Sequence, residues 1–303
     1  MSPLVPYLEL PELPIVSARF FGRFPEQAIT LKPFGMLVAL GAYTGTVAAL
    51  RQARRLGMSD RAVLSFTGWV AVSSFFFAHF LDALFYYPRD VLADPLFLFR
   101  LWEGLSSFGG FTGALIGAIA WRIHHKAAFL PHADVVASAF PLSWSFGRLG
   151  CTVAHDHPGL RSDFLLAVRY PDGGRHDLGF YELLVTVPLA LAFLLLRRKP
   201  RPWGFYGGVM CTYYAPIRFL FDFLREGPDT TGTGIVPGDA RYFGLTPAQW
   251  ACFPLLVLGI TLLLRMKGEG QALPAVPAAF RTAPAPGSGV EGDGTGGDAR
   301  DER

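Results

Sequence analysis

The residues best suited to chemistry form a cluster near the middle of the chain, where a glycine-flanked arginine precedes two histidines. The segment 146–159 reads FGRLGCTVAHDHPG, and its notable members are Gly147, Arg148, Gly150, His155, Asp156, His157 and Gly159. Guanidinium groups bind phosphate bidentately, and imidazoles exchange protons near neutral pH. The cluster therefore indicates anion binding with proton transfer, or else a helix end whose arginine reaches the interface before a solvated loop.

Metal ligands are weakly indicated in this cluster. Two histidines separated by one residue lie on nearly opposite sides of a helix, and no second group of ligands is evident. The chain has only three cysteines, Cys151, Cys211 and Cys252, and they are widely spaced in or beside apolar segments. This spacing argues against a disulfide framework or a cysteine-based zinc site, so we expect no metal.

A second charged group is Arg218, Asp222 and Arg225, embedded among aromatic residues. Spacings of four and three residues place all three on one helical face, where Asp222 can bridge both arginines. One interpretation is an ion-pair ladder that joins helices. The other is that Arg218 joins Arg148 in an anion clamp, because both guanidinium groups suit phosphate.

Two further segments combine polar residues with glycines. The sequence RHDLGFYE contains His176, Tyr181 and Glu182, which could belong to an acid–base network. The segment 102–113, WEGLSSFGGFTG, places Gly109 and Gly110 at the start of an apolar run. These glycines indicate either close helix packing or access for a lipid headgroup.

The composition indicates that a lipid bilayer surrounds these polar clusters. Of 303 residues, 51% are hydrophobic and 17% charged, and the mean hydropathy is +0.33. A water-soluble domain has fewer apolar and more charged residues. The net charge of +3 and the lack of a dense basic block argue against a nucleic-acid partner.

Seven apolar runs are long enough to be candidate membrane spans, and they predict an all-α polytopic membrane protein. They are approximately Pro33 to Leu50, Ala62 to Tyr86, Ser106 to Trp121, Val135 to Gly150, Leu178 to Leu196, Phe205 to Leu224 and Pro247 to Leu264. The third, fourth and sixth are polar and glycine-rich. Ionisable groups in lipid are costly unless they face partners or a cavity, so these three spans are expected to hold a site.

Basic residues predict the orientation of the spans. The connections 51–61, 122–126, 197–201 and 265–267 hold twelve Lys or Arg in twenty-four positions, whereas the alternate connections hold seven in sixty. Basic loops face the cytoplasm, so we expect an external N-terminus and a cytoplasmic C-terminus. Residues 33–267 form the predicted transmembrane domain. Residues 1–32 are expected to be an external amphipathic lead-in, and residues 268–303 a disordered cytoplasmic tail.

Four motifs in order resemble the prolipoprotein diacylglyceryl transferases of bacterial inner membranes. They are Gly147-Arg148-Leu149-Gly150, His176 with Tyr181-Glu182, Arg218 with Asp222 and Arg225 before Pro228-Asp229, and Trp102-Glu103-Gly104 before a glycine-rich helix. The resemblance extends from about Pro33 to Lys267 with the same seven spans. It implies transfer of a diacylglyceryl group from phosphatidylglycerol to the lipobox cysteine thiol of a lipoprotein precursor, whose signal peptide is then a partner.

The resemblance also implies residue roles. Arg148 and Arg218 would hold the phosphate of the lipid, Asp156 stands where the family has Glu, and Gly159, His176, Tyr181 and Glu182 match directly. No cofactor is expected, because displacement at a phosphoester-bearing carbon needs only a base and an anion site.

The chain departs from the family at four positions. Cys151 and Ala154 replace asparagines, Gly109 replaces a histidine before the glycine pair, and Phe34 stands near a usual tyrosine. We hypothesise that His155 or His157 supplies the missing imidazole, with Asp156 holding its tautomer or pairing with Arg148. The alternatives are a non-catalytic protein that binds lipid or signal peptide on the same scaffold, and a small transporter, although no internal repeat supports the latter.

Overall fold

The computed structural model describes residues 3–16, 29–100, 104–226, 240–266 and 280. The lead-in aromatics Phe20, Phe21 and Phe24 lie outside these residues, as do Trp102-Glu103, Pro228-Asp229 and almost all of the predicted tail.

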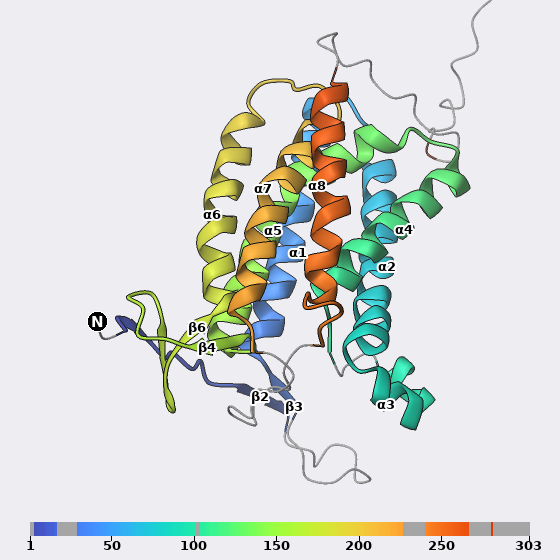
Figure 1. The fold of residues 1–303 in the computed structure, drawn as a ribbon. Helices are drawn as coiled ribbons and strands as arrows, with labels where there is room; N and C mark the ends of the chain where they lie inside the picture. The colour runs from blue at the N-terminus through green and yellow to red at the C-terminus, as the bar shows by residue number, and fades with distance from the viewer. Residues whose placement is uncertain (1–2, 17–28, 101–103, 227–239, 267–279, 281–303) are drawn as a thin grey trace, which may run out of the picture.

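Seven long helices dominate the described residues, and each coincides with one of the apolar runs (Figure 1). They are α1 Pro33–Arg55, α2 Asp60–Tyr86, α4 Ser107–His125, α5 Phe129–Ala154, α6 Leu178–Leu196, α7 Phe205–Phe221 and α8 Pro247–Arg265. Three short helices accompany them: α3 Pro88–Ala93, η2 Pro95–Phe99 and η3 Asp222–Leu224. Four of the long helices, α1, α2, α6 and α8, are long and apolar enough to cross a membrane.

The expectation of an all-α chain was incomplete, because strands gather at one end of the helices (Figure 1). A four-stranded sheet has the order β1-β5-β6-β4, and β2 pairs with β3. The strands are β1 Val5–Pro6, β2 Leu13–Val16, β3 Ile29–Leu31, β4 Pro158–Arg161, β5 Val168–Tyr170 and β6 Gly173–Asp177. Gly173 begins β6 directly after the turn at Pro171-Asp172 and has a φ of 126°, a conformation that favours glycine.

The surface and interior reverse the pattern of a water-soluble protein. Large apolar side chains such as Val72, Ile123 and Leu264 are 73%, 71% and 81% exposed on the outer faces of helices. Charged groups such as Glu182 and Asp222 are fully buried between helices. Soluble proteins seldom expose such apolar faces or bury so many charges, so this chain is a polytopic membrane protein.

Glycines let the helices α2 and α4 approach each other closely. A Cβ atom on Gly109 of α4 would lie 2.3 Å from the Phe77 carbonyl oxygen of α2, whereas one on Gly110 would be 4.0 Å from Ala78 Cβ. Neither glycine lies among the residues that line the main cavity described below. Gly109 therefore lies in the α2–α4 contact, as close helix packing predicts, and the role of the pair in headgroup access stays a prediction.

We predict that Gly109→Ala destabilises the protein, because the new methyl group meets backbone that cannot move aside. Overpacking of this kind costs about 1–3 kcal/mol, against a gain of about 1 kcal/mol in helix propensity. The matched control is Gly110→Ala, which has room for a methyl group and should be neutral or stabilising. Thermal unfolding of both variants in detergent compares them, and equal midpoints would contradict the packing argument.

Candidate functional site

A buried ion-pair network joins α5, α6 and α7. Glu182 of α6 is fully buried, and its two carboxylate oxygens accept from two arginines. Arg148 Nη2 lies 2.8 Å from Glu182 Oε2, and Arg218 Nη1 lies 2.6 Å from Glu182 Oε1. Tyr214 donates its hydroxyl to Oε2 at 2.6 Å. The two arginines that the sequence singled out are thus brought to one anion, which is a carboxylate of the protein itself.

Asp222 extends the network in the way that its spacing predicted. Its Oδ1 atom lies 2.9 Å from Arg218 Nη2 and 3.0 Å from Arg225 Nε, so one carboxylate bridges both arginines. Thr246, at the start of α8, donates its hydroxyl to the other oxygen of Asp222. The helix α7 ends at Phe221, and Asp222 begins the turn η3. The three charged residues therefore do not share one helix: Arg218 belongs to α7, Asp222 begins η3, and Arg225 follows η3.

The network is constrained because its members are buried. Removing one partner of a buried ion pair costs about 3–5 kcal/mol, since the other charge is left uncompensated. Arg148, Arg218 and Arg225 contribute three positive charges, and Glu182 and Asp222 contribute two negative ones. One formal positive charge remains within this set, which favours binding of a monoanion such as a phosphodiester.

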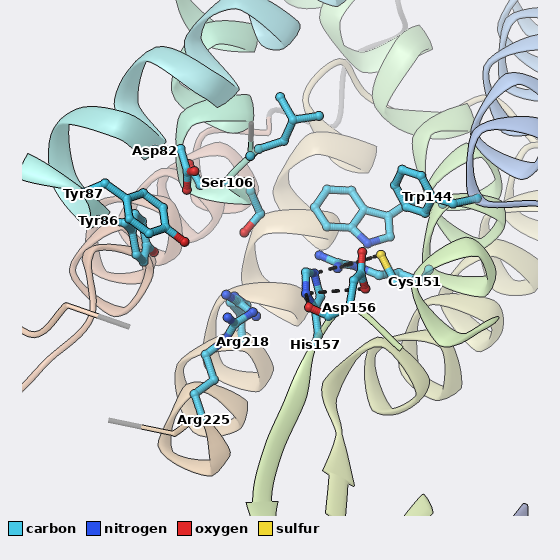
Figure 2. A pocket seen from close by; sticks show the side chains of 16 residues that line it. Asp82, Tyr86, Tyr87, Ser106, Trp144, Cys151, Asp156, His157, Arg218 and Arg225 are labelled. Atoms are coloured by element: carbon cyan, nitrogen blue, oxygen red, sulfur yellow. Dashed lines mark hydrogen bonds and ion pairs between the residues drawn. The ribbon is translucent and has the colours of Figure 1, made fainter. Parts of the chain in front are cut away.

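A cavity of about 560 Å³ opens beside this network (Figure 2). Its wall is formed by the ends of α2, α5 and α7 and by the segments that adjoin them. The lining residues are Phe34, Asp82, Tyr86, Tyr87, Gly104, Leu105, Ser106, Ser107, Trp144, Gly147, Arg148, Cys151, Asp156, His157, Arg218 and Arg225. Figure 2 shows Asp82, Tyr86 and Tyr87 across the cavity from Cys151 and His157. This volume and mixed lining suit a lipid headgroup together with a peptide side chain.

The structure separates the two histidines that the sequence treated as equivalents. His155 follows the last residue of α5 in a left-handed conformation with a φ of 50°, which turns the chain away from the helix axis. Its Nδ1 lies 2.9 Å from Asp177 Oδ2 and its Nε2 lies 3.2 Å from the Leu8 carbonyl oxygen. Tyr7 stacks on the ring at a centroid distance of 3.9 Å. Both nitrogens are thus engaged by the segment after β1 and by Asp177, and His155 is not among the residues that line the cavity.

His157, in contrast, lines the cavity. Its Nδ1 lies 2.7 Å from the backbone carbonyl of Asp156, and because a carbonyl only accepts, Nδ1 carries the hydrogen. The Nε2 lone pair then faces Cys151 Sγ at 4.0 Å. Burial and the nearby Arg225 and Arg148 lower the pKa of His157 to about 3, so the ring is neutral at physiological pH.

Asp156 stands beside the same imidazole. Its Oδ1 is 3.5 Å from His157 Nδ1, whereas the partner that orients His155 is Asp177. Partial desolvation raises the pKa of Asp156, whose side chain is 39% exposed, and Arg148 opposes that rise. The sequence hypothesis that Asp156 orients an imidazole therefore fits His157 and not His155.

His176 and Tyr181 form a pair at the edge of the site. His176 Nδ1 lies 2.8 Å from the Tyr181 hydroxyl, and neither residue lines the cavity. A Cβ atom added to Gly159 would lie 2.5 Å from the Leu224 carbonyl oxygen, so only glycine fits there. Gly150 packs on Phe34 of α1. Gly147 has no atom within 4 Å of its Cβ position and lines the cavity. Of the four sequence motifs, the two arginine motifs and Gly104 line the cavity, whereas His176 and Tyr181 do not.

Several residues of the site were missed by the sequence analysis. Asp82, Tyr86, Tyr87 and Trp144 line the cavity, and Tyr214 holds Glu182. Asp82 and Tyr86 are four residues apart in an apolar run, a spacing that places a carboxylate and a hydroxyl on one helical face. That pattern was a usable signal, whereas the position of Trp144 in an aromatic-rich span carried none.

Arg175 was also missed, and it fastens the sheet to the segment that follows η3. The side chain is fully buried and donates to the Gly159 carbonyl at 3.1 Å and to Glu226 Oε1 at 2.5 Å. It also binds Asp172 through two of its nitrogens, with the shorter contact at 2.5 Å. Because Arg225 precedes Glu226, these contacts fix the sheet beside one arginine of the site.

Taken together, the fold and the site define a polytopic membrane protein in which two helix-borne arginines meet a cavity large enough for a lipid headgroup. A model of the family described as Prolipoprotein diacylglyceryl transferase matches residues 24–265. The chain therefore belongs to that family, and the resemblance drawn from the four motifs is confirmed.

Curated relatives are similar over most of the chain. A phosphatidylglycerol–prolipoprotein diacylglyceryl transferase from Chromohalobacter salexigens is 32% identical over 78% of this chain and 90% of its own length. The protein of the same name from Vibrio parahaemolyticus is 31% identical over 78% of this chain and 86% of its own length. One from Polynucleobacter asymbioticus is 34% identical over 60% of this chain and 69% of its own length.

Proposed function

We propose that this chain transfers a diacylglyceryl group from phosphatidylglycerol to the cysteine thiol of a prolipoprotein. The observation that carries this proposal is the meeting of Arg148 and Arg218 beside a cavity, within a chain of this family. The new bond joins the thiol sulfur to the terminal glycerol carbon of the diacylglyceryl group. The bond from that carbon to the phosphate oxygen breaks, and glycerol phosphate leaves with the electron pair.

The arginines bind the phosphate before the reaction and stabilise it as it leaves. Charge grows on the phosphate oxygens as the carbon–oxygen bond breaks, and donors already fixed in place stabilise that charge without reorganisation. Glu182 holds both guanidinium groups in position, because its carboxylate contacts Arg148 and Arg218 at once. Glu182, Asp222 and Tyr214 are therefore positioning residues in this proposal.

His157 is the imidazole placed to assist the thiol. It lines the cavity with its Nε2 lone pair turned inward, whereas His155 is engaged elsewhere. The chain lacks the family histidine at Gly109, and that position is packed against α2. His157 thus takes over a role for which the α4 helix offers no side chain. Asp156 fixes the imidazole through its backbone carbonyl.

We further propose that all seven long helices cross the bacterial inner membrane as one domain of residues 33–267. Figure 1 supports this arrangement, because the helices run side by side and the strands and α3 gather at one end. The basic connections 51–61, 122–126 and 197–201 join helices at the opposite end. Basic connections face the cytoplasm, so the sheet and the mouth of the cavity face outward, where prolipoproteins arrive.

We predict that a periplasm-active reporter fused after Lys267 is silent, because α8 ends at the basic end of the helices. The matched control is the same reporter inserted at Arg161–Ser162, between β4 and β5, which should be active. Membrane fractionation verifies that both fusions insert. Strong periplasmic activity from the Lys267 fusion would invert the proposed orientation.

The proposed function is tested directly with purified protein, phosphatidylglycerol and a lipobox peptide. We expect a peptide mass increased by one diacylglyceryl group, and no product when the peptide cysteine is replaced by serine. Restored lipoprotein modification in a bacterium depleted of its own transferase would extend the result to cells. Binding of lipid or peptide without any transfer would instead support the non-catalytic alternative, which the substitutions at Cys151, Ala154, Gly109 and Phe34 favour.

A further inference from the structure

Three potential metal ligands meet in the wall of the cavity. The sulfur of Cys151, a carboxylate oxygen of Asp156 and a ring nitrogen of His157 all lie within 4.8 Å of one another. The sequence spacing argued against a metal on the two histidines, and His155 indeed points elsewhere. The end of α5 brings a different set together, because Cys151 lies in its last turn and the chain folds back at His155.

The imidazole is oriented as a ligand. His157 Nδ1 donates to the Asp156 carbonyl, which leaves Nε2 to face Cys151 Sγ at 4.0 Å. Histidines that bind metals almost always donate their other nitrogen to a carbonyl or carboxylate in this way. The contact thus leaves Nε2 as the ring nitrogen that is available to an ion.

The distances between the three ligand atoms need little change for these atoms to bind one ion. Bonds of about 2.0–2.3 Å in a tetrahedral zinc site separate the ligand atoms by roughly 3.3–3.8 Å. Ligand atoms now up to 4.8 Å apart reach that spacing through small side-chain movements. A thiolate with an imidazole favours Zn²⁺ over Mg²⁺ or Ca²⁺, which prefer oxygen ligands.

Charge complementarity points the same way. Asp156 and Asp82 line the cavity together with Arg148, so the wall offers carboxylates for a cation beside an arginine for an anion. A divalent cation bound by one thiolate and one carboxylate forms a neutral centre. Arg148 Nη1, at 3.7 Å from Cys151 Sγ, donates to the sulfur, while Glu182 offsets the charge of that arginine.

We propose that Cys151, Asp156 and His157 bind Zn²⁺, and that the substrate thiol occupies the fourth coordination position, which opens into the cavity. This inference rests on the proposed function and gives it a means of activating the thiol. Three protein ligands and one open position are typical of catalytic zinc sites.

The ion performs the step for which the family histidine is missing, and His157 then assists the thiol as a ligand of the ion and not as its base. A thiol that coordinates a metal loses its proton, which passes to water, and the bound thiolate remains nucleophilic. The thiolate attacks the glycerol carbon, the carbon–oxygen bond breaks towards the phosphate, and glycerol phosphate leaves beside Arg148 and Arg218. The thioether product binds zinc less well than the thiolate and departs.

The test begins with metal binding in the full-length protein, purified in detergent without chelator. We expect about one Zn²⁺ per chain by elemental analysis, consistent with a single site. After zinc is removed, added Co²⁺ should produce a thiolate-to-cobalt charge-transfer band. Cys151→Ser should abolish the band, and His157→Ala and Asp156→Asn should weaken Co²⁺ binding. Cys211→Ser is the matched control, since this buried cysteine lies away from the cavity, and it should keep the band.

The outcomes separate this proposal from the proposed function. Lack of stoichiometric zinc together with lack of the cobalt band overturns the metal site, even where transfer proceeds. A cobalt band that persists in Cys151→Ser also overturns it, because the sulfur would come from another residue. A band that depends on Cys151 without any lipid transfer would support the metal site and overturn the function. Circular dichroism and thermal unfolding establish whether each variant is folded. If Cys151→Ser does not fold, Co²⁺ binding by the Asp156→Asn and His157→Ala variants decides whether the metal site exists.

Discussion

Replacing Arg148 with alanine is expected to reduce diacylglyceryl transfer by at least about 10²–10³-fold, the loss typical of one electrostatic donor to a developing charge. The same result is expected for Arg218→Ala. Each arginine contacts Glu182, so removing either leaves the buried carboxylate with a single cationic partner and the phosphate with half of its clamp. The transfer assay with phosphatidylglycerol and a lipobox peptide measures the loss.

The controls separate catalysis from structure. Arg161 is an exposed arginine of the sheet with a surface partner, and Arg161→Ala should leave transfer unchanged. Arg148→Lys and Arg218→Lys keep the charge but lose the bidentate fork, so both should remain strongly impaired. If Arg218→Ala prevents folding while Arg218→Lys restores full transfer, a purely structural ion pair with Asp222 is the better account.

The sequence predicted these arginines because a charge in an apolar run requires a partner or a cavity. It also predicted the bridge at Asp222, because residues four and three positions apart stay close even though α7 ends at Phe221 and Asp222 begins η3. The position of Glu182 between two arginines was not predictable from periodicity. That contact joins three helices, and long-range packing determines which buried groups meet.

The ends of helices set the other limit to prediction. The apolar run placed the end of the fourth span at Gly150, whereas α5 continues to Ala154 and then turns at His155. A shift of a few residues decides which histidine enters the cavity, and hydropathy does not resolve such a shift. The sheet was missed for a related reason: strands β4 to β6 are short and each carries an arginine, and β4 and β6 contain glycine, so they resemble a loop in sequence.

The same helix end gives the second large prediction, which concerns the two histidines separately. We expect His157→Ala to reduce transfer by about 10²–10⁴-fold at neutral pH, the usual contribution of a group that assists proton loss. The loss should shrink as the pH rises from 7 to 9, because a thiol with a pKa of about 8.5 then ionises without help. Rates measured for the peptide substrate across pH 6 to 9 give the profile.

His155→Ala should behave differently, because it removes a support of the fold and not a group in the cavity. Its loss leaves Asp177 without one of its partners and Tyr7 without its stacking contact, at a cost of about 1–3 kcal/mol in stability. The thermal midpoint should fall, while transfer by the folded protein keeps the wild-type pH profile. A wild-type rate for His157→Ala throughout the range would exclude His157 from thiol activation. A pH-dependent loss confined to His155→Ala would return that role to the histidine which the structure places against the N-terminal strand.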